Sequence, residues 1–226
     1  MTAQLTGDYT YPNQLPKPPP GPYSMQQEPI TSEIRTIIRH QFSDRPDVFV
    51  SGEGYLCYDT RIRPGWLVPD LVVAFGVDPE AIFSRNGYVI SEVGKPPDFV
   101  LEIASESTGV ADYTRKRDGY AAYEVLEYWR SDASGGQYHD RPLAGDLLVD
   151  GVYRPMPIHH EPDGTIWGHS PVLGLDLHWL DGRLRFYDPQ AERYLLSLTE
   201  SETRATAAIA ELARLREQMR RLRGED

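Results

Sequence analysis

The sequence reads Pro69-Asp70-Leu71-Val72-Val73-Ala74-Phe75 and, further along, Asp98-Phe99-Val100-Leu101-Glu102-Ile103-Ala104-Ser105. Both stretches are short and almost wholly apolar, which is typical of strands that are covered on both faces. Each nevertheless carries a carboxylate, Asp70 at the start of the first run and Glu102 inside the second. An unpaired buried carboxylate is costly, so Glu102 requires a partner cation, a metal ion or a raised pKa.

Simpler interpretations of both carboxylates stay open at this point. Pro69-Asp70 is also a common turn pair, in which Asp70 acts as a cap. Glu102 faces water if its strand lies at the edge of a sheet.

The segment after the second strand predicts a helix over residues 110–125. Three hydroxyl side chains that can cap this helix precede it: Ser105, Ser107 and Thr108. Asp112, Lys116 and Tyr120 follow at four-residue spacing, so they share one helical face. An ordinary i,i+4 ion pair between Asp112 and Lys116 explains part of this spacing equally well.

The chain before the first strand divides into a leader and a helix. Residues 1–29 are rich in proline, which predicts an extended arm that docks, if at all, on a protein partner. Apolar spacing predicts a helix over 31–42. Glu33 suits the first turn of that helix as a charge favoured by the helix dipole, and a supporting role in a metal site is the alternative.

Further strand signals surround the two central runs. Residues 48–58 predict a strand pair or a bent strand, and the connection over 76–97 predicts a short helix near 80–83 and a hairpin near 88–93. Residues 127–130 predict a third core strand. Short strands over 147–187 predict an antiparallel extension of the core, and its four histidines are interpreted as structural: His159, His160, His169 and His178.

The last segment, 198–223, predicts a long helix without proline. Its apolar and small residues repeat at alternating spacings of three and four, as in a coiled-coil seam: Leu198, Ser201, Ala205, Ala208, Leu212, Leu215, Met219 and Leu222. A homodimer through this helix and a helix packed on its own domain are both open. We therefore expect a leader (1–29), one domain (30–197) and a C-terminal helix (198–226).

Charge and cysteine content narrow the classes of function. The 226 residues carry 23 Lys and Arg against 34 Asp and Glu, a net charge of −11, which argues against tight non-specific binding of long nucleic acids. The candidate nucleic-acid contacts are four arginines near the core, for which solvated charges are the simpler interpretation: Arg61, Arg63, Arg115 and Arg117. The single cysteine, Cys57, fits a reducing cytoplasm. No apolar run is long enough to cross a membrane, and no secretory signal is visible.

Several segments together resemble one family. They are Val68 to Val73, Gly94 to Thr108, the Asp112…Lys116…Tyr120 face, and Glu127-Tyr128-Trp129. In this combination the chain resembles the Uma-two family of restriction-endonuclease-like proteins, in the PD-(D/E)xK nuclease superfamily. The resemblance implies an α/β (α+β) fold with a restriction-endonuclease-like core, in which helices flank a mixed central sheet.

The resemblance also implies a catalytic set. Asp70 and Glu102 correspond to metal ligands for Mg²⁺, with Mn²⁺ as a substitute. The lysine that usually follows the glutamate by two places is replaced by Ala104, and Lys116 on the next helix corresponds to it. Asp112 and Tyr120 match further family positions, and Ser105 and Glu33 are expected as supporting residues.

Three functions are consistent with this set. The first is a metal-dependent endonuclease that hydrolyses phosphodiester bonds, with DNA as the expected substrate. The second is a catalytically silent module on the same fold, which assembles or binds through its N-terminal arm and C-terminal helix. The third is a phosphoesterase that acts on something smaller than DNA.

Overall fold

A computed structural model describes residues 15–16, 27–62 and 65–223 of the chain, without the side chains of 27–29, 221 and 222. Most of the predicted leader lies outside the described residues. Its described part includes Leu15, which is buried beside Cys57 and Val89. The Leu15 N–H donates to the Arg85 carbonyl at 2.7 Å. This part of the leader therefore docks on the chain's own domain.

The centre of the fold is a mixed sheet. Among the described residues, six strands form it in the order β1 (Val48–Ser51), β3 (Leu71–Phe75), β5 (Phe99–Ile103), β6 (Glu127–Ser131), β7 (Leu143–Val149) and β8 (Val152–Pro155). β5 and β6 are parallel, and the other neighbours are antiparallel. The predicted mixed central sheet flanked by helices is confirmed.

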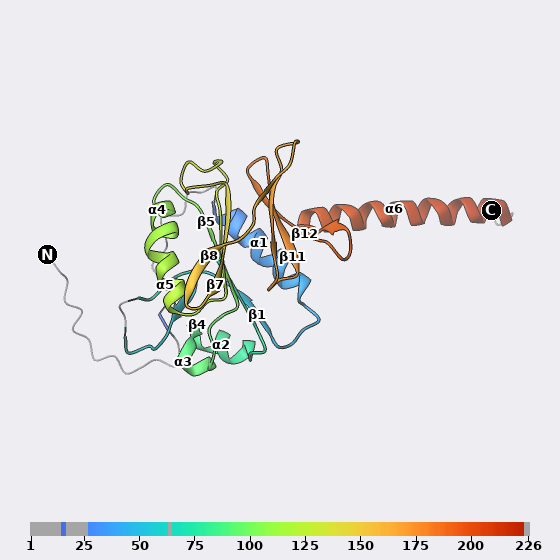
Figure 1. Cartoon of the computed structure of the whole chain (residues 1–226). Coiled ribbons are helices and arrows are strands. Elements are labelled where there is room, and N and C mark those ends of the chain that lie inside the picture. The colour runs from blue at the N-terminus through green and yellow to red at the C-terminus, as the bar shows by residue number, and fades with distance from the viewer. Residues whose placement is uncertain (1–14, 17–26, 63–64, 224–226) are drawn as a thin grey trace.

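The two faces of this sheet follow from the alternation of side chains along its strands. Leu71 and Val73 of β3 point into a core that they share with α1 and the second sheet. Val72 and Ala74 point to the opposite face, toward α2, α5 and the short strands. Both faces are thus covered, which is why these strands are almost wholly apolar. Figure 1 shows α4 and α5 on one side of the sheet and α1 on the other.

Helix α1 (Gln27–Gln41) begins four residues before the predicted start. Pro29 lies in its first turn, where the absent amide proton has no partner to lose. Because it is a proline, Pro29 was assigned to the leader, and this predicted boundary between leader and helix is wrong. Ile34, Ile37 and Ile38 form the buried face of the helix.

In the region between β1 and β5, the strands pair differently from the prediction. β2 (Tyr55–Cys57) pairs in parallel with β4 (Gly87–Val89) in a separate two-stranded sheet. The expected short helix is α2 (Pro79–Arg85), capped by Asp78. The expected hairpin is wrong, because Ile90–Val93 turns into the single-turn helix α3 and ends at Gly94 with φ of 87°.

The helical connection between β5 and β6 is not one regular helix. It consists of α4 (Gly109–Ala111), a π-helical turn η1 (Asp112–Lys116) and α5 (Arg117–Ala122). A π turn inserts an extra residue and rotates the side chains that follow it. Asp112 and Lys116 bound this turn.

The predicted extension of the core separates into two parts. β7 and β8 continue the central sheet, as expected. A second, antiparallel sheet holds β9 (His159–His160), β10 (Ile166–Ser170), β11 (Leu175–Leu180), β12 (Arg183–Asp188) and β13 (Arg193–Tyr194). It packs through Leu175, Leu177 and Phe186 on the core of α1 and the central sheet, so it is a second layer rather than a continuation.

Helix α6 (Leu198–Arg223) extends away from the body of the molecule (Figure 1). Among the seam residues whose side chains are described, Ser201 is half-buried and the others are exposed, with Leu212 at 47% and Met219 at 53%. The alternative that this helix packs along its own domain is therefore wrong over most of its length. No described helix is both long and apolar enough to cross a bilayer.

Candidate active site

Strands β3 and β5 bring the two predicted carboxylates together. The strands pair with Leu71 opposite Leu101, and one further step of this register places Asp70 opposite Glu102. β5 lies between β3 and β6, and Glu102 is only 1% exposed. The edge-strand interpretation of Glu102 is therefore wrong. The Oδ2 atom of Asp70 accepts the N–H of Ile103 at 2.7 Å, which fixes its carboxylate beside the next residue of β5.

The predicted helical face delivers Lys116 to this point. Its Nζ atom lies 2.9 Å from Glu102 Oε2 and 2.9 Å from Asp112 Oδ1. The lysine side chain is 13% exposed. Since Asp70 is 8% exposed, these two side chains form the edge of the cluster that solvent reaches.

Tyr120 and Asp112 complete the cluster from the same helical connection. The Tyr120 hydroxyl donates to Glu102 Oε1 at 2.5 Å. Asp112 is fully buried, and the Tyr128 hydroxyl holds its backbone carbonyl at 2.7 Å. Both oxygens of Glu102 are thus occupied, one by a neutral donor and one by a cation.

Burial sets the charge state of these groups. Burial raises the pKa of Asp70, and it raises the pKa of Glu102 well above its usual range, with the Lys116 ammonium opposing both shifts. Burial alone would lower the pKa of Lys116, but the carboxylates of Glu102, Asp112 and Asp70 raise it above its ordinary value. Burial and then Glu102 raise the pKa of Tyr120, so its hydroxyl stays protonated and donates.

The same cluster contains His139, for which no role was predicted from the sequence. Its Nε2 atom lies 3.0 Å from Asp112 Oδ2, and its side chain is fully buried. It comes from the loop between β6 and β7, 27 residues after Asp112. The sequence signal available was a lone histidine in a polar loop, which does not specify a contact.

Two of the expected supporting residues lie elsewhere. Ser105 accepts the N–H of Thr108 at 3.2 Å, and its Oγ lies 2.6 Å from Thr108 Oγ1. It therefore turns the chain from β5 into α4. Glu33 is exposed on α1, which packs on the opposite face of the sheet from Glu102. The structure does not bring Glu33 into the cluster.

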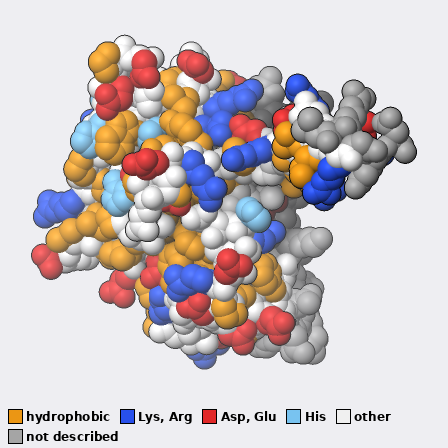
Figure 2. Space-filling model, turned by 90° about the vertical axis from the view of Figure 1, so that its right-hand side faces the viewer, with side chains coloured by type: hydrophobic (Ala, Val, Ile, Leu, Met, Phe, Trp, Pro, Cys, Tyr) orange, Lys and Arg blue, Asp and Glu red, His pale blue; other side chains and the backbone are white. Residues whose placement is uncertain are grey.

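The four arginines also separate. Arg117 is held by Asp146 of β7 through contacts of 2.7 and 3.0 Å. Arg61 forms an exposed pair with Asp59, and Arg115 is exposed on η1. Arg63 lies outside the described residues. On the face drawn in Figure 2, basic and acidic side chains are intermixed rather than gathered into one basic patch.

The donor atoms of the cluster suit a hard divalent cation. Asp70 and Glu102 offer carboxylate oxygens, and Mg²⁺ is commonly held by one or two carboxylates together with waters and substrate phosphates. Among the described residues, no group of three or more His, Cys, Asp or Glu side chains is arranged to hold a metal ion. When Asp70, Glu102 and Asp112 are all ionised, their three negative charges are opposed by the single positive charge of Lys116. The resulting excess of negative charge is the kind that a divalent cation offsets.

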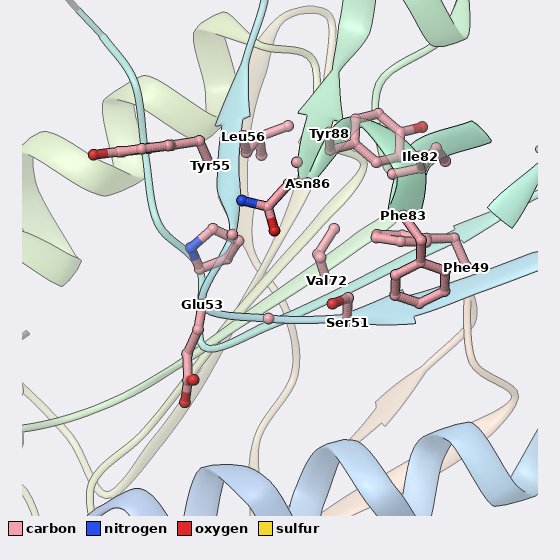
Figure 3. A pocket seen from close by; sticks show the side chains of 14 residues that line it. Phe49, Ser51, Glu53, Tyr55, Leu56, Val72, Ile82, Phe83, Asn86 and Tyr88 are labelled. Carbon is pink, nitrogen blue, oxygen red and sulfur yellow. The ribbon is translucent and has the colours of Figure 1, made fainter. Parts of the chain in front are cut away.

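A hollow lies beside β1 and β3, on the face of the central sheet that also carries Glu102 (Figure 3). Its volume is about 110 Å³, and its wall includes Pro69 and Val72, which lie within two residues of Asp70 in the sequence. The aromatic rings of Phe49, Phe83 and Tyr88 line it. The one charged side chain among its described lining residues is Glu53, which pairs with Arg35 at 2.7 Å. The hollow thus contains no cation for a phosphate and is distinct from the polar cluster.

The chain matches a protein-family model and is similar to a solved structure. A family model named Uma2, described as "Putative restriction endonuclease", matches residues 14–180. Among solved structures, the chain is similar to "a putative nuclease belonging to DUF820" from Anabaena variabilis ATCC 29413, with 18% identity, 70% of this chain and 78% of that chain covered, and a TM-score of 0.45. No curated protein sequence matches the chain. The family match covers every residue of the polar cluster and ends with β11.

Proposed function

The chain belongs to the Uma2 family, which is described as "Putative restriction endonuclease", and we propose that it is a metal-dependent endonuclease acting on DNA. One observation carries this proposal: the Lys116 ammonium lies 2.9 Å from Glu102, on the strand beside Asp70. Two carboxylates can hold a divalent cation for phosphodiester hydrolysis, and a nearby ammonium can stabilise the negative charge that develops.

We assign Asp70 and Glu102 as the residues that hold Mg²⁺, or Mn²⁺ in its place. Bound there, the ion supplies Lewis-acid polarisation of a phosphate oxygen and a lower pKa for a bound water. The protein's own part is to keep both carboxylates in one place. The Ile103 N–H fixes Asp70, and the Tyr120 hydroxyl fixes Glu102.

We assign Lys116 as the residue that meets the phosphate. Its ammonium stays protonated at neutral pH because its pKa is raised above the ordinary value. It lies at the edge of the cluster that solvent reaches. A fixed positive charge in this place stabilises the negative charge that develops on the phosphate oxygens as water attacks.

DNA is proposed as the substrate on the family description, and the charge of the chain limits how it is bound. A net charge of −11 repels a polyanion over most of the surface. Binding therefore depends on the cluster, its cation and nearby arginines such as Arg115. We expect weak association with a short DNA footprint, and, because few phosphates are contacted, a shallow dependence of the affinity on salt concentration.

The test is a cleavage assay on single- and double-stranded DNA and RNA with Mg²⁺, Mn²⁺ or EDTA. We expect cation-dependent cutting of DNA that is lost in Glu102→Ala. A matched control is Glu106→Ala, because Glu106 lies four residues after Glu102 and its side chain is exposed. Cutting of RNA alone would change the substrate. The absence of cutting by a folded protein, with no Mn²⁺ binding by calorimetry, would refute the enzyme.

The exposed seam of α6 favours an assembly role in addition. Leu212, Leu215 and Met219 face solvent at heptad spacing, and this pattern matches a second copy of the same helix. Glu211 and Arg216 flank the seam and would pair between parallel helices. We propose a homodimer through α6. If the assay above fails, the same surface supports the silent assembly module, with the leader as a second contact for a protein partner.

A further inference from the structure

His139 has no assigned role, yet it reaches the centre of the proposed site. Its side chain is fully buried, and its Nε2 atom contacts the Asp112 carboxylate at 3.0 Å. The other oxygen of that carboxylate lies 2.9 Å from Lys116 Nζ. His139, Asp112, Lys116 and Glu102 therefore form one continuous chain of contacts.

The loop that carries His139 is held firmly at its base. Asp132 Oδ2 accepts the N–H groups of Tyr138 and His139, both at 2.8 Å. Asp132 Oδ1 accepts the N–H of Ser134 at 2.8 Å. A side chain at Gly109 would come within 2.1 Å of the Tyr138 carbonyl, so the glycine permits this loop to pack on α4. The imidazole is thus presented by a preorganised loop.

The surroundings of the ring favour one tautomer. The Nδ1 atom is buried and has no hydrogen-bond partner among the described residues. An ionised carboxylate accepts hydrogen bonds and cannot donate them. The contact between Nε2 and Asp112 Oδ2 at 3.0 Å therefore places a ring hydrogen on Nε2, which donates to Asp112.

Asp112 needs this donor to orient Lys116. Its side chain is fully buried, and Lys116 and His139 contact its two carboxylate oxygens. A carboxylate held on one side alone rotates about its terminal bond, and the lysine would follow it. The π turn η1, which begins at Asp112 and ends at Lys116, fixes the spacing between the two backbones, while the carboxylate fixes the direction of the ammonium.

We propose that His139 is a positioning residue of the nuclease site: it donates from Nε2 to Asp112, which in turn aims Lys116 at Glu102 and at the phosphate. This inference rests on the proposed function. Supporting residues one step behind a metal site typically contribute about 10- to 100-fold to activity. The effect should appear in kcat rather than in KM, because His139 does not reach solvent.

The kinetic test uses His139→Leu, His139→Gln and Asp112→Asn in the full chain. We expect His139→Leu to lower kcat about 10- to 100-fold with little change in KM. We expect His139→Gln, whose amide can donate to Asp112, to recover part of that loss. In the Asp112→Asn background, His139→Leu should add almost nothing, because its route to Lys116 is already cut. An unchanged kcat in His139→Leu, or an undiminished effect in the Asp112→Asn background, would overturn the proposal.

A spectroscopic test stands apart from activity. Long-range ¹H–¹⁵N spectra of the imidazole should show a hydrogen on Nε2 of His139. The ¹³Cε resonance of Lys116 should shift in His139→Leu but not in the control His169→Leu, because His169 makes a similar contact, 2.6 Å to Asp176, in the second sheet. A protein that fails to cut but shows both signals loses the nuclease proposal and keeps the positioning role. An unmoved Lys116 resonance overturns the role whether or not the protein cuts.

Discussion

Lys116 Nζ lies 2.9 Å from Glu102 Oε2, although the glutamate is in a central strand and the lysine ends a π-helical turn. Ala104, two residues after Glu102, points to the same face of the sheet and carries no charge. The helix therefore supplies the cation that the strand lacks. Because the helix and strand must pack correctly for this pair to form, the charge balance of the site depends on the tertiary fold.

The first prediction concerns removal of that cation. Lys116→Met should reduce cleavage about 10²- to 10³-fold, the typical loss when one preorganised electrostatic donor is removed. It should also destabilise the fold by about 3 kcal/mol or more at pH 8, because Glu102 and Asp112 are left buried without a counter-charge. Circular dichroism melting measures the stability, and the cleavage assay measures the rate.

The control for this variant is Lys95→Met. Lys95 also pairs with a carboxylate, Asp98, at 2.8 Å, but on a half-exposed surface. Such pairs contribute little to stability. Equal melting temperatures for Lys116→Met and the wild type at pH 8 would contradict a buried, functional ion pair.

The second prediction concerns pH and Glu102. Burial raises the folded pKa of Glu102 well above the ordinary value of 4.5. The unfolded chain loses this proton near pH 4.5, while the folded chain keeps it to higher pH and so binds more protons in between. Stability from this group therefore falls as pH rises from about 4.5 to the folded pKa, by about 1.4 kcal/mol for each unit of the shift.

Glu102→Gln removes this titration from the buried cluster. The melting temperature of the variant relative to wild type should therefore rise between pH 5 and pH 8 without metal. Mg²⁺ should close the gap by stabilising the wild type alone, because it binds the ionised carboxylate. The raised pKa of Lys116 acts above pH 10 and leaves this window unaffected. A difference in melting temperature that stays constant with pH would show that Glu102 is not desolvated.

The third prediction concerns a buried carboxylate with the opposite role. Glu127 on β6 accepts hydrogen bonds from Trp129 Nε1 at 2.9 Å, Ser170 Oγ at 2.6 Å and the Val172 N–H at 2.8 Å. It ties the central sheet to the second sheet. Glu127→Ala leaves these buried donors unpaired and should cost at least about 3 kcal/mol. Chemical denaturation measures this loss.

Glu127 should not affect metal binding. Its side chain lies on the same face as Trp129, which packs in the core opposite the Glu102 face. Calorimetry with Mn²⁺ at a temperature where the variant stays folded should give the wild-type affinity. A joint loss of stability and Mn²⁺ affinity would mean that the two faces of the sheet are coupled.

These two glutamates show how far the sequence could lead. Apolar runs interrupted by a carboxylate correctly predicted central strands and a polar cluster at Glu102, because few other arrangements tolerate such a residue. The four-residue spacing of Asp112, Lys116 and Tyr120 correctly predicted that they share one face of the helical connection. Glu127 also lies in a central strand, but two of its three partners, Ser170 and Val172, lie 43 and 45 residues away, so the local pattern did not indicate that it joins the two sheets.

The misses have the same origin in distant contacts. The parallel pairing of β2 with β4 joins segments some 30 residues apart, whereas the hairpin that was expected is a local structure. The second sheet was predicted as strands but not as a separate layer, because alternation along a strand does not identify the sheet that it joins. His139 was missed because a loop of 11 residues between β6 and β7 places it, and its position depends on Asp132 rather than on periodicity.

The last prediction concerns α6 and the homodimer. The helix is about 39 Å long and exposes Leu212 and Leu215 by nearly half. Exposure of apolar side chains to water is unfavourable, and it is removed when two copies of the helix bury the seam against each other. Wild-type protein should therefore sediment as a dimer at micromolar concentration. Leu212→Glu with Leu215→Glu should give a monomer, since four like charges would meet in the seam, and the melting temperature of the domain should change little.

Ala210→Glu with Ala213→Glu adds the same charge on the outer side of the helix and should leave the dimer intact. A monomeric wild type, or a dimer that survives the leucine changes, would show that α6 serves a different partner.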